Sequence, residues 1–301
     1  DMKTYGWELQ IGWRDQIGDF KYGAKLSLSD SQSKILRYGN PTGSLSKYVE
    51  GELIGNIYGY TTIGIAKTDE EMQQHLASLP NGGQSALGSQ WAAGDIMYAD
   101  LNGDGKINNG SYTINDMGDM KKIGNSTPRF MTGINLDAAY KGWDLQMFWQ
   151  GVLKRDWWPG DKNMTFWGVT DGEWWSTSFK EHLDYFRTSE NPLGENLNSY
   201  YPRPIFNTKN NKSQTRYLQN AAYMRLKNIQ VGYTFPKVWI NKLMLQNLRI
   251  FVSGENLLTI TSLSDTMDPE TCGAGYQSTE QANGTVYPLA KTISFGLSVN
   301  F

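Results

Sequence analysis

Residues 292–301 alternate between apolar and small polar side chains without exception. The apolar positions are Ile293, Phe295, Leu297, Val299 and Phe301. A period of two residues predicts a β-strand with one apolar and one polar face. Ten residues also suffice to cross a bilayer at the tilt that strands have in membrane barrels. The pattern is typical of the closing strand of a transmembrane barrel, although a single strand of a soluble sandwich would show the same alternation.

The alternation recurs along the chain, and seven segments carry it. The predicted strands are residues 5–14, 20–28, 130–140, 143–150, 229–235, 248–255 and 292–301. Lys141 and Gly142 form the whole turn between two of these strands, which is a hairpin signal. The connection from Pro236 to Asn247 is expected to contain one helical turn around Trp239. The chain therefore predicts an up-and-down antiparallel sheet.

The connections between the predicted strands alternate in length. Long connections span residues 31–128 and 155–221, a medium one spans 260–286, and short turns join the remaining strands. Strands that cross a membrane in alternate directions place short turns on one side and long loops on the other. A soluble antiparallel sandwich has no reason for this asymmetry. The sequence thus favours an all-β fold, a transmembrane antiparallel β-barrel in which residues 31–128 and 155–221 are long extracellular loops.

Seven strands cannot close a membrane barrel, because the single-chain barrels of bacteria have at least eight strands and an even number of them. An open edge in lipid would leave backbone N–H and C=O groups unsatisfied at several kcal/mol each. The chain begins Asp-Met-Lys-Thr-Tyr, without a basic region, an apolar region or a cleavage site that would mark a leader. It is therefore expected to be either cytosolic or the downstream part of a longer protein. The strand count favours a longer protein. Its upstream strands, and the segment that fills the pore, are then expected to lie outside residues 1–301.

The amino-acid composition supports an all-β protein and argues against several other classes of protein. The chain is 39% hydrophobic and contains 32 glycines, 17 tyrosines and 11 tryptophans, which is typical of strands and turns rather than helices. It lacks a stretch of eighteen apolar residues, so a transmembrane helix is not expected. The net charge of -2 gives no reason to expect nucleic acid as a partner. Cys272 is the only cysteine, which excludes an internal disulfide and a cysteine metal cluster.

One motif has the spacing of a calcium loop. The sequence DLNGDG at residues 100–105 places oxygen-bearing side chains at alternate positions before a glycine that permits a sharp turn. Ser111 occupies the position where such loops usually carry an acidic closing ligand, so Asp119 or Asp116 is the candidate for that role. The alternative is a turn cluster without metal. The predicted calcium ligands are Asp100, Asn102, Asp104, the carbonyl of Lys106, and Asp119.

Tryptophans crowd the second long connection. Their flat faces could stack on sugar rings or seat a partner protein, since aromatic residues dominate binding hot spots. The alternative is a loop that folds on itself and buries them. Residues 172–186 are predicted to form an amphipathic helix inside this loop. The candidate contact residues are Trp157, Trp158, Trp167, Trp174 and Trp175.

The sequence gives no support for an enzyme. His75 and His182 are the only histidines, and both fall in predicted loops. GxSxG, HExxH, P-loop and Cys-His signatures are missing. A phospholipase built on a barrel would need a histidine in a strand, so catalytic residues are not predicted.

Several stretches resemble a known family. They are GDIMYADLNGDGKI at 94–107, KKIGNSTPRFMTGINLDAAYKGWDLQMFWQG at 121–151, YLQNAAYMRLKNIQVGYTFP at 217–236, NLRIFVSGENLLTIT at 247–261 and the terminal YPLAKTISFGLSVNF. Together with residues 48–72, they are similar to the C-terminal barrel region of SusC/RagA-type TonB-dependent outer-membrane transporters. The resemblance covers nearly the whole chain in the family's order.

The resemblance implies an active importer in the bacterial outer membrane, with these strands as the last seven of about 22. It implies a TonB complex acting through a plug domain that is absent from this chain, a SusD-like lipoprotein as a lid, and surrounding outer-membrane lipid. It also suggests a dimer of such pairs. The expected cargo is oligomeric, most often glycans. A RagA-type peptide importer, a passive barrel or adhesin, and a soluble carbohydrate-binding sandwich are the alternatives.

Charged residues on the polar side of the predicted strands have both signs. Most of these charges are expected to be structural, paired within a polar interior or with a plug. Their mixed signs suggest docking of a plug rather than a selectivity ring, which would use one sign. The charged residues are Glu8, Arg14, Lys21, Lys25, Asp137, Asp144, Arg249 and Glu255.

Overall fold

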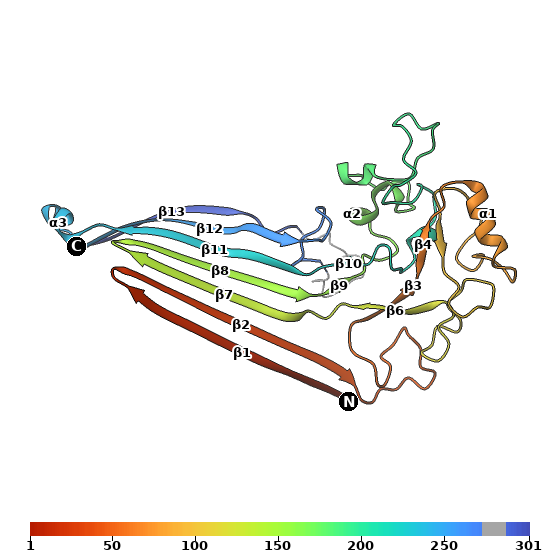
Figure 1. Cartoon of the computed structure of the whole chain (residues 1–301), viewed down its shortest axis with the longest axis horizontal. Coiled ribbons are helices and arrows are strands. Elements are labelled where there is room, and N and C mark those ends of the chain that lie inside the picture. The colour runs from red at the N-terminus through yellow and green to blue at the C-terminus, as the bar shows by residue number, and fades with distance from the viewer. Residues whose placement is uncertain (273–286) are drawn as a thin grey trace.

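A long open sheet with a body of loops at one end makes up the protein (Figure 1). The computed structural model describes residues 1–272 and 287–301. Seven antiparallel strands follow one another in the order β1-β2-β7-β8-β11-β12-β13. They are β1 (Met2–Ile17), β2 (Phe20–Ile35), β7 (Arg129–Tyr140), β8 (Trp143–Lys154), β11 (Tyr223–Thr234), β12 (Asn247–Thr261) and β13 (Thr292–Asn300). All seven predicted strands are therefore confirmed, and each pairs with its sequence neighbour in the predicted up-and-down order.

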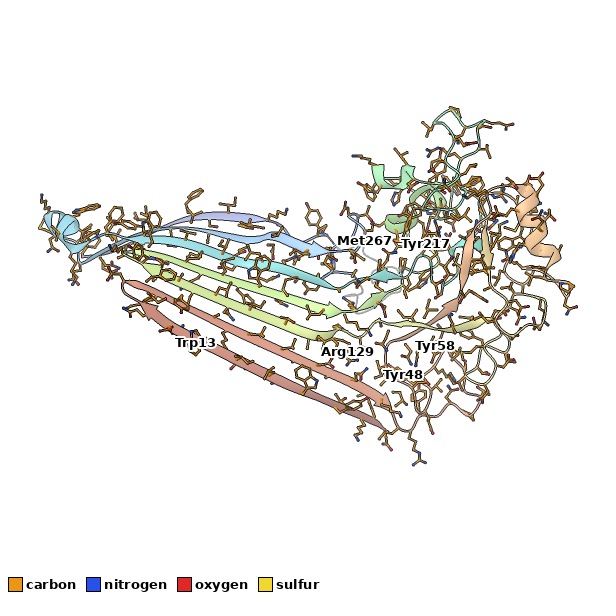
Figure 2. All side chains as sticks on the ribbon, in the orientation of Figure 1. Trp13, Tyr48, Tyr58, Arg129, Tyr217 and Met267 are labelled. Carbon is orange, nitrogen blue, oxygen red and sulfur yellow. The ribbon has the colours of Figure 1, made fainter. Side chains whose placement is uncertain are left out.

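One face of the sheet is apolar and uncovered. We call the face that carries Trp13, Trp143 and Phe295 the apolar face and the opposite one the polar face. These three side chains are 65%, 56% and 82% exposed, and Figure 2 shows Trp13 projecting from the sheet without a second layer over it. A soluble sandwich would bury this face under a second sheet. The exposure excludes a sandwich for the described part of the chain and fits a wall that faces hydrocarbon.

Several strands extend beyond the predicted bounds, and for β2 and β11 the physical reasons are clear. β2 continues past Leu28 to Ile35 because its backbone stays paired with β1 after the apolar alternation gives way to serines. β11 begins at Tyr223, six residues before the predicted start. A register shift between Leu226 and Asn228 interrupts the period of two. Even-numbered residues before the shift and odd-numbered residues after it therefore lie on the apolar face.

The loop body at one end of the sheet contains short elements. The strands are β3 (Asn56–Tyr60), β4 (Thr62–Ile65), β5 (Ile96–Tyr98), β6 (Met120–Asn125), β9 (Asp156–Trp157) and β10 (Gln219–Asn220). The helices are α1 (Asp69–Ala77), α2 (Met164–Trp167), η1 (Gly168–Thr170), η2 (Lys180–Leu183) and η3 (Lys209–Asn211). Three antiparallel pairs, β3 with β6, β4 with β5 and β9 with β10, hold the body together. The buried hydrophobic core lies here and not against the sheet.

The opposite end of the sheet carries the short turns. The turn between β7 and β8 is Lys141 and Gly142, as predicted. A helical turn, α3 (Lys237–Ile240), followed by η4 (Asn241–Leu243), lies at this end between β11 and β12, which confirms the turn expected around Trp239 (Figure 1). None of the helices in the described residues is long and apolar enough to span a membrane.

The predicted amphipathic helix over residues 172–186 is wrong. Only η2 is helical within this range. Phe179 adopts extended backbone angles before η2, and its N–H donates to Nδ1 of the buried His182 at 2.8 Å. His182 Nε2 also lies 3.1 Å from the carbonyl of Thr165. A helical spacing of apolar residues could not anticipate that the histidine, rather than the tryptophans, anchors this segment.

Candidate functional site

The two long loops are joined by a buried carboxylate. Asp95 belongs to the first loop, directly before β5, and is fully buried. Arg203 of the second loop donates to both of its oxygens at 2.8 Å. The Lys209 ammonium lies 2.8 Å from Asp95 Oδ2, and Asn210 Nδ2 donates to Oδ1 at 2.9 Å. One side chain thus fixes the first loop to three residues of the second.

The electrostatics of this junction keep Asp95 ionised. Burial alone would raise the pKa of the Asp95 carboxyl, but hydrogen bonds from Arg203, Asn210 and Lys209 outweigh burial and hold that pKa below its usual value. Burial lowers the pKa of the Lys209 ammonium, and Asp95 opposes that shift. The ammonium also lies 4.5 Å from the centre of the Trp91 ring.

A glycine allows the loops to approach this closely. Gly94 has a φ of +84°, and a Cβ atom there would lie 2.4 Å from Phe186 Cδ1 and 2.8 Å from Arg203 Cβ. Both the backbone angle and the space therefore require glycine next to Asp95. This junction was not predicted, because nothing in the sequence separates Asp95 from the other aspartates of the loops.

The tryptophans of the second loop divide into two groups. Trp157 and Trp167 are 4% and 0% exposed. Trp167 lies 4.8 Å, between ring centres, from both Phe166 and Tyr217, and its Nε1 donates to the carbonyl of Gly160 at 2.8 Å. Figure 2 shows Tyr217 inside the loop body. These two tryptophans build the core, and Trp158, half-buried, packs against Trp167 with ring centres 6.1 Å apart.

The remaining two tryptophans face solvent. Trp174 is 79% exposed and Trp175 is 54% exposed, with their rings at 5.2 Å in an edge-to-face arrangement. Phe206, which is 83% exposed, lines the same cavity of about 360 Å³ as Trp174. We call Trp174, Trp175 and Phe206 the loop patch. Exposed aromatic residues on a body with its own core present a preformed contact surface.

The DLNGDG segment forms a tight, internally bonded loop. Asp100 accepts hydrogen bonds from the N–H groups of Gly103 and Gly105 at 2.7 and 2.8 Å. Asn102 Oδ1 accepts from the N–H of Asp104 at 2.9 Å, and Asp104 Oδ1 accepts from that of Lys106 at 3.1 Å. In the described residues, groups of three or more acidic, histidine or cysteine side chains that could hold a metal ion are not found.

The two candidates for the closing ligand lie in different surroundings. Asp119 is fully buried and accepts from the N–H groups of Leu101 and Asn108 at 2.9 and 2.8 Å. Burial raises the pKa of the Asp119 carboxyl, and the neighbouring charge of Asp100 adds to that rise. Asp116 instead accepts from the N–H and hydroxyl of Ser111 within its own turn. Asp119 is therefore the acid that the fold brings to Asp100.

Known proteins resemble this chain in sequence and in fold. None of the known family models matches the chain. The chain is similar over its whole length to two proteins of Formosa agariphila, TonB-dependent receptor P3 at 27% identity and TonB-dependent receptor P39 at 24% identity. The chain is related to the TonB-dependent receptors. It spans 29% and 30% of the length of these two relatives.

The fold has solved counterparts. The whole chain superposes on 29% of a chain in a structure of the RagAB peptide transporter, with a TM-score of 0.65 and 18% identity. It also superposes on 30% of a chain of the RagAB peptide importer in a closed-closed state, with a TM-score of 0.59 and 16% identity. The predicted fold class is confirmed: the sheet is an open part of an antiparallel transmembrane β-barrel. The SusC/RagA resemblance found in the sequence agrees with both sets of relatives.

In this barrel wall, charges on the polar face pair across glycines. Arg249 Nε on β12 donates to Asp144 Oδ2 on β8 at 3.1 Å and passes over Gly232 on β11 between them. A Cβ atom at Gly232 would lie 2.4 Å from the Arg249 guanidinium and 2.6 Å from Asp144 Oδ2, so a side chain there would displace the bridge from its observed path. Arg14 on β1 reaches Asp137 on β7 in the same way, at 3.2 Å, over Gly23 on β2.

These bridges give four of the eight wall charges a structural role within the sheet. Arg14, Asp137, Asp144 and Arg249 are satisfied within the wall itself. Side-chain partners for Glu8, Lys21, Lys25 and Glu255 are not found among the described residues. Contact with a plug stays a prediction for these four. Spacing along the sequence did not show which charges would pair, because each bridge spans three strands.

Proposed function

We propose that this chain forms the C-terminal wall and extracellular loop body of an outer-membrane importer for oligomeric nutrients, energised by TonB. The observation that carries the proposal is the uncovered apolar face on seven strands whose opposite face is polar, in a chain similar throughout to TonB-dependent receptors. In this mechanism TonB acts on a plug outside this chain, and the paired charges keep the wall a rigid conduit. A passive barrel or adhesin would work without TonB.

Uptake by living cells tests the proposal. A strain that lacks the gene for the whole transporter should lose growth on its glycan, and the gene should restore growth only when TonB is present. Growth that returns in a strain without TonB would contradict active import and favour a passive barrel. Peptides belong in the same assay, because RagAB, which shares the fold, is a peptide transporter.

We further propose that the loop patch contacts a SusD-like lipoprotein that covers the mouth of the barrel, in a pair that could itself dimerise. Three exposed aromatic rings on a body fixed by the Asp95 junction support this role. The similarity of the fold to RagAB supports a lipoprotein as the partner.

Replacing Trp174 and Trp175 together by alanine is expected to raise the dissociation constant for the lipoprotein about 30-fold or more. Loss of a hot-spot tryptophan costs roughly 2 kcal/mol or more, and 1.4 kcal/mol corresponds to a factor of ten. Co-purification and titration of the two proteins measure the change. Trp239→Ala is the control, because Trp239 is 60% exposed but lies at the short-turn end of the sheet. Unchanged affinity in the double variant would remove the lid role from the patch.

We also propose that the DLNGDG loop binds one Ca²⁺ through Asp100, Asn102, Asp104, the Lys106 carbonyl and Asp119. The oxygen-rich donor set and the burial of Asp119 beside Asp100 support this role. When bound, the ion would supply the charge compensation that two neighbouring carboxylates lack.

Metal analysis of the full-length protein, purified without chelator, is expected to give about one calcium per chain, since the loop offers one such donor set. Asp104→Asn should lower that content, while Asp116→Asn should not, because Asp116 bonds only within its own turn. Calcium-free wild-type protein would contradict the assignment.

A further inference from the structure

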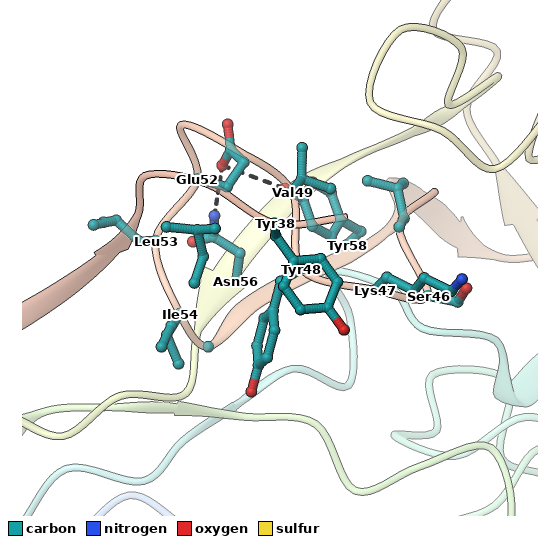
Figure 3. Close-up of a pocket in the computed structure, with 13 residues that line it drawn as sticks. Tyr38, Ser46, Lys47, Tyr48, Val49, Glu52, Leu53, Ile54, Asn56 and Tyr58 are labelled. Atoms are coloured by element: carbon teal, nitrogen blue, oxygen red, sulfur yellow. Dashed lines mark hydrogen bonds between the residues drawn. The ribbon is translucent and has the colours of Figure 1, made fainter. Parts of the chain in front are cut away.

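Two further cavities of the protein have opposite linings. Figure 3 shows the one where the first long loop leaves β2, in which Glu52 Oε2 accepts from Asn56 at 2.6 Å and from the Tyr58 hydroxyl at 3.3 Å. The other lies on the apolar face of the wall and has a volume of about 430 Å³. Among the described residues that line it, the only polar side-chain groups are the Tyr233 hydroxyl and the Trp143 indole N–H. We call this second cavity the outer groove, and its lining selects an apolar ligand.

Short side chains form the floor of the outer groove, and aromatic rings stand beside them. The floor residues are Val231, Ile250 and Val252. Trp143 on β8 pairs with Tyr233 on β11, and Phe295 on β13 pairs with Val252 on β12, so rings lie on both sides of the floor. The floor strands β11 and β12 are each flanked by strands of this chain. The groove therefore does not depend on strands outside residues 1–301.

A line of aromatic rings leads from the groove to the short-turn end of the sheet. Ring centres are 4.9 Å apart between Trp143 and Tyr233 and 5.1 Å apart between Tyr233 and Phe235. The Phe235 ring lies 6.3 Å from that of Trp239 in α3, and Trp239 is 60% exposed. Exposed aromatic residues at the end of a membrane wall are typical of the boundary between hydrocarbon and water. We therefore place this boundary at α3.

The depth of the groove matches one leaflet of a bilayer. Val231 precedes Phe235 by four residues. At about 3.3 Å per residue, the two positions are roughly 13 Å apart along the strand. The hydrocarbon core of a bilayer is about 30 Å thick, so one leaflet contributes about 15 Å. A chain in the groove thus extends from the boundary at α3 almost to the centre of the bilayer, as an acyl chain does.

Two cations lie at the boundary end of the groove. Lys237 in α3 and Lys242 in η4 belong to the connection between the floor strands β11 and β12, and both are exposed. Within the described part of the chain, neither lysine forms an ion pair with an acidic side chain. Asp144, at the same end of β8, bonds to Arg249 on the polar face. An anionic group at this end of the apolar face would therefore meet positive charge that acids do not compensate.

We propose that the outer groove binds one anionic phospholipid. An acyl chain lies against Val231 and Val252, and the phosphate lies at Lys237 and Lys242. The inference rests on the proposed function, which places the loop body outside the cell and therefore this end of the wall in the leaflet that faces the periplasm. The volume of about 430 Å³ lies within the range of roughly 300–1,000 Å³ that is usual for ligand pockets. A zwitterionic phospholipid carries the same chains but no net charge, so the lysines should favour the anionic lipid.

The test is native mass spectrometry of the full-length transporter in detergent. It is titrated with phosphatidylglycerol, which is anionic, and with phosphatidylethanolamine, which is zwitterionic and has the same acyl chains. Phosphatidylglycerol should saturate one site and bind more tightly. Lys237→Ala with Lys242→Ala should weaken its binding about 10- to 30-fold and should leave phosphatidylethanolamine little affected. The matched control is Lys67→Ala with Lys180→Ala, because both of these lysines are exposed on the loop body.

A second variant tests the groove itself. Val231→Trp places a large ring on the floor, so it should weaken the binding of both lipids about tenfold or more. Ile11→Trp is its control, because Ile11 is 55% exposed on the same face of β1, away from the groove. The lysine variants change only exposed side chains, so they test the site even if Val231→Trp disturbs the strand.

Four outcomes would overturn the site. They are the lack of saturable lipid binding, equal affinity for the two lipids, affinity that the variants do not change, and a Val231→Trp variant that alters only the oligomeric state. The last result would show that a protein covers the groove. Failure here is distinct from failure of the proposed function, because growth without TonB contradicts import, whereas lipid binding in detergent does not involve TonB.

Discussion

Replacing Trp167 by alanine is expected to destabilise the loop body by about 3–5 kcal/mol, the usual cost of removing a large aromatic side chain from a packed core. Trp167 is 0% exposed, contacts Phe166 and Tyr217, and bonds to the Gly160 carbonyl. Hydrogen exchange and limited proteolysis of residues 155–221 in the full-length protein would measure the loss. The barrel strands should keep their protection, since the core of the loop body does not rest on the sheet.

Trp174→Ala supplies the matched comparison. The residue type and the loop are the same, but Trp174 is 79% exposed. Substitutions at such positions usually change stability by no more than about 0.5 kcal/mol. Equal protection of the loop in the two variants would show that Trp167 does not hold the core, contrary to its burial.

Asp95→Asn is expected to loosen the junction between the two long loops at a cost of about 3–5 kcal/mol, which is typical when a buried ion pair loses one partner. Asparagine keeps the shape of the side chain but leaves Lys209, with a side chain only 2% exposed, beside a neutral group. Hydrogen exchange around residues 95–98 and 203–211 measures the effect. The control is Glu190→Gln, an exposed acid of the second loop. If both variants exchange alike, the carboxylate does not join the loops.

The same junction predicts a response to acid. The pKa of Asp95 is lower in the folded protein than its usual value of 3.8. A carboxylate with a lowered folded pKa contributes stability that is fully present above the unfolded pKa and is lost as the pH falls through the folded pKa. Wild-type loops should therefore loosen below about pH 4. Asp95→Asn should lack this component, and the difference between the two profiles separates it from other carboxylates.

The loop body shows where local patterns stop being informative. Trp167 and Trp174 lie seven residues apart in similar surroundings of glycine, serine and threonine, yet one is core and the other surface. The aspartates of the DLNGDG motif have a recognisable spacing, whereas Asp95 belongs to no recognisable sequence pattern. Its partners Arg203 and Lys209 follow more than a hundred residues later. The wrong helix at residues 172–186 has the same cause, since a tertiary contact of His182 outweighed the spacing of apolar residues.

The sequence by itself determined the barrel wall. A strand with one face in hydrocarbon and one face in water must alternate at every position, so the period of two, the hairpin at Lys141 and Gly142, and the alternation of short and long connections were all readable. Only the tertiary structure decided the bulge in β11, the bridges across Gly232 and Gly23, and the Asp95 junction. Each of these depends on backbone segments that meet across strands or loops, and a one-dimensional pattern does not record which segments meet.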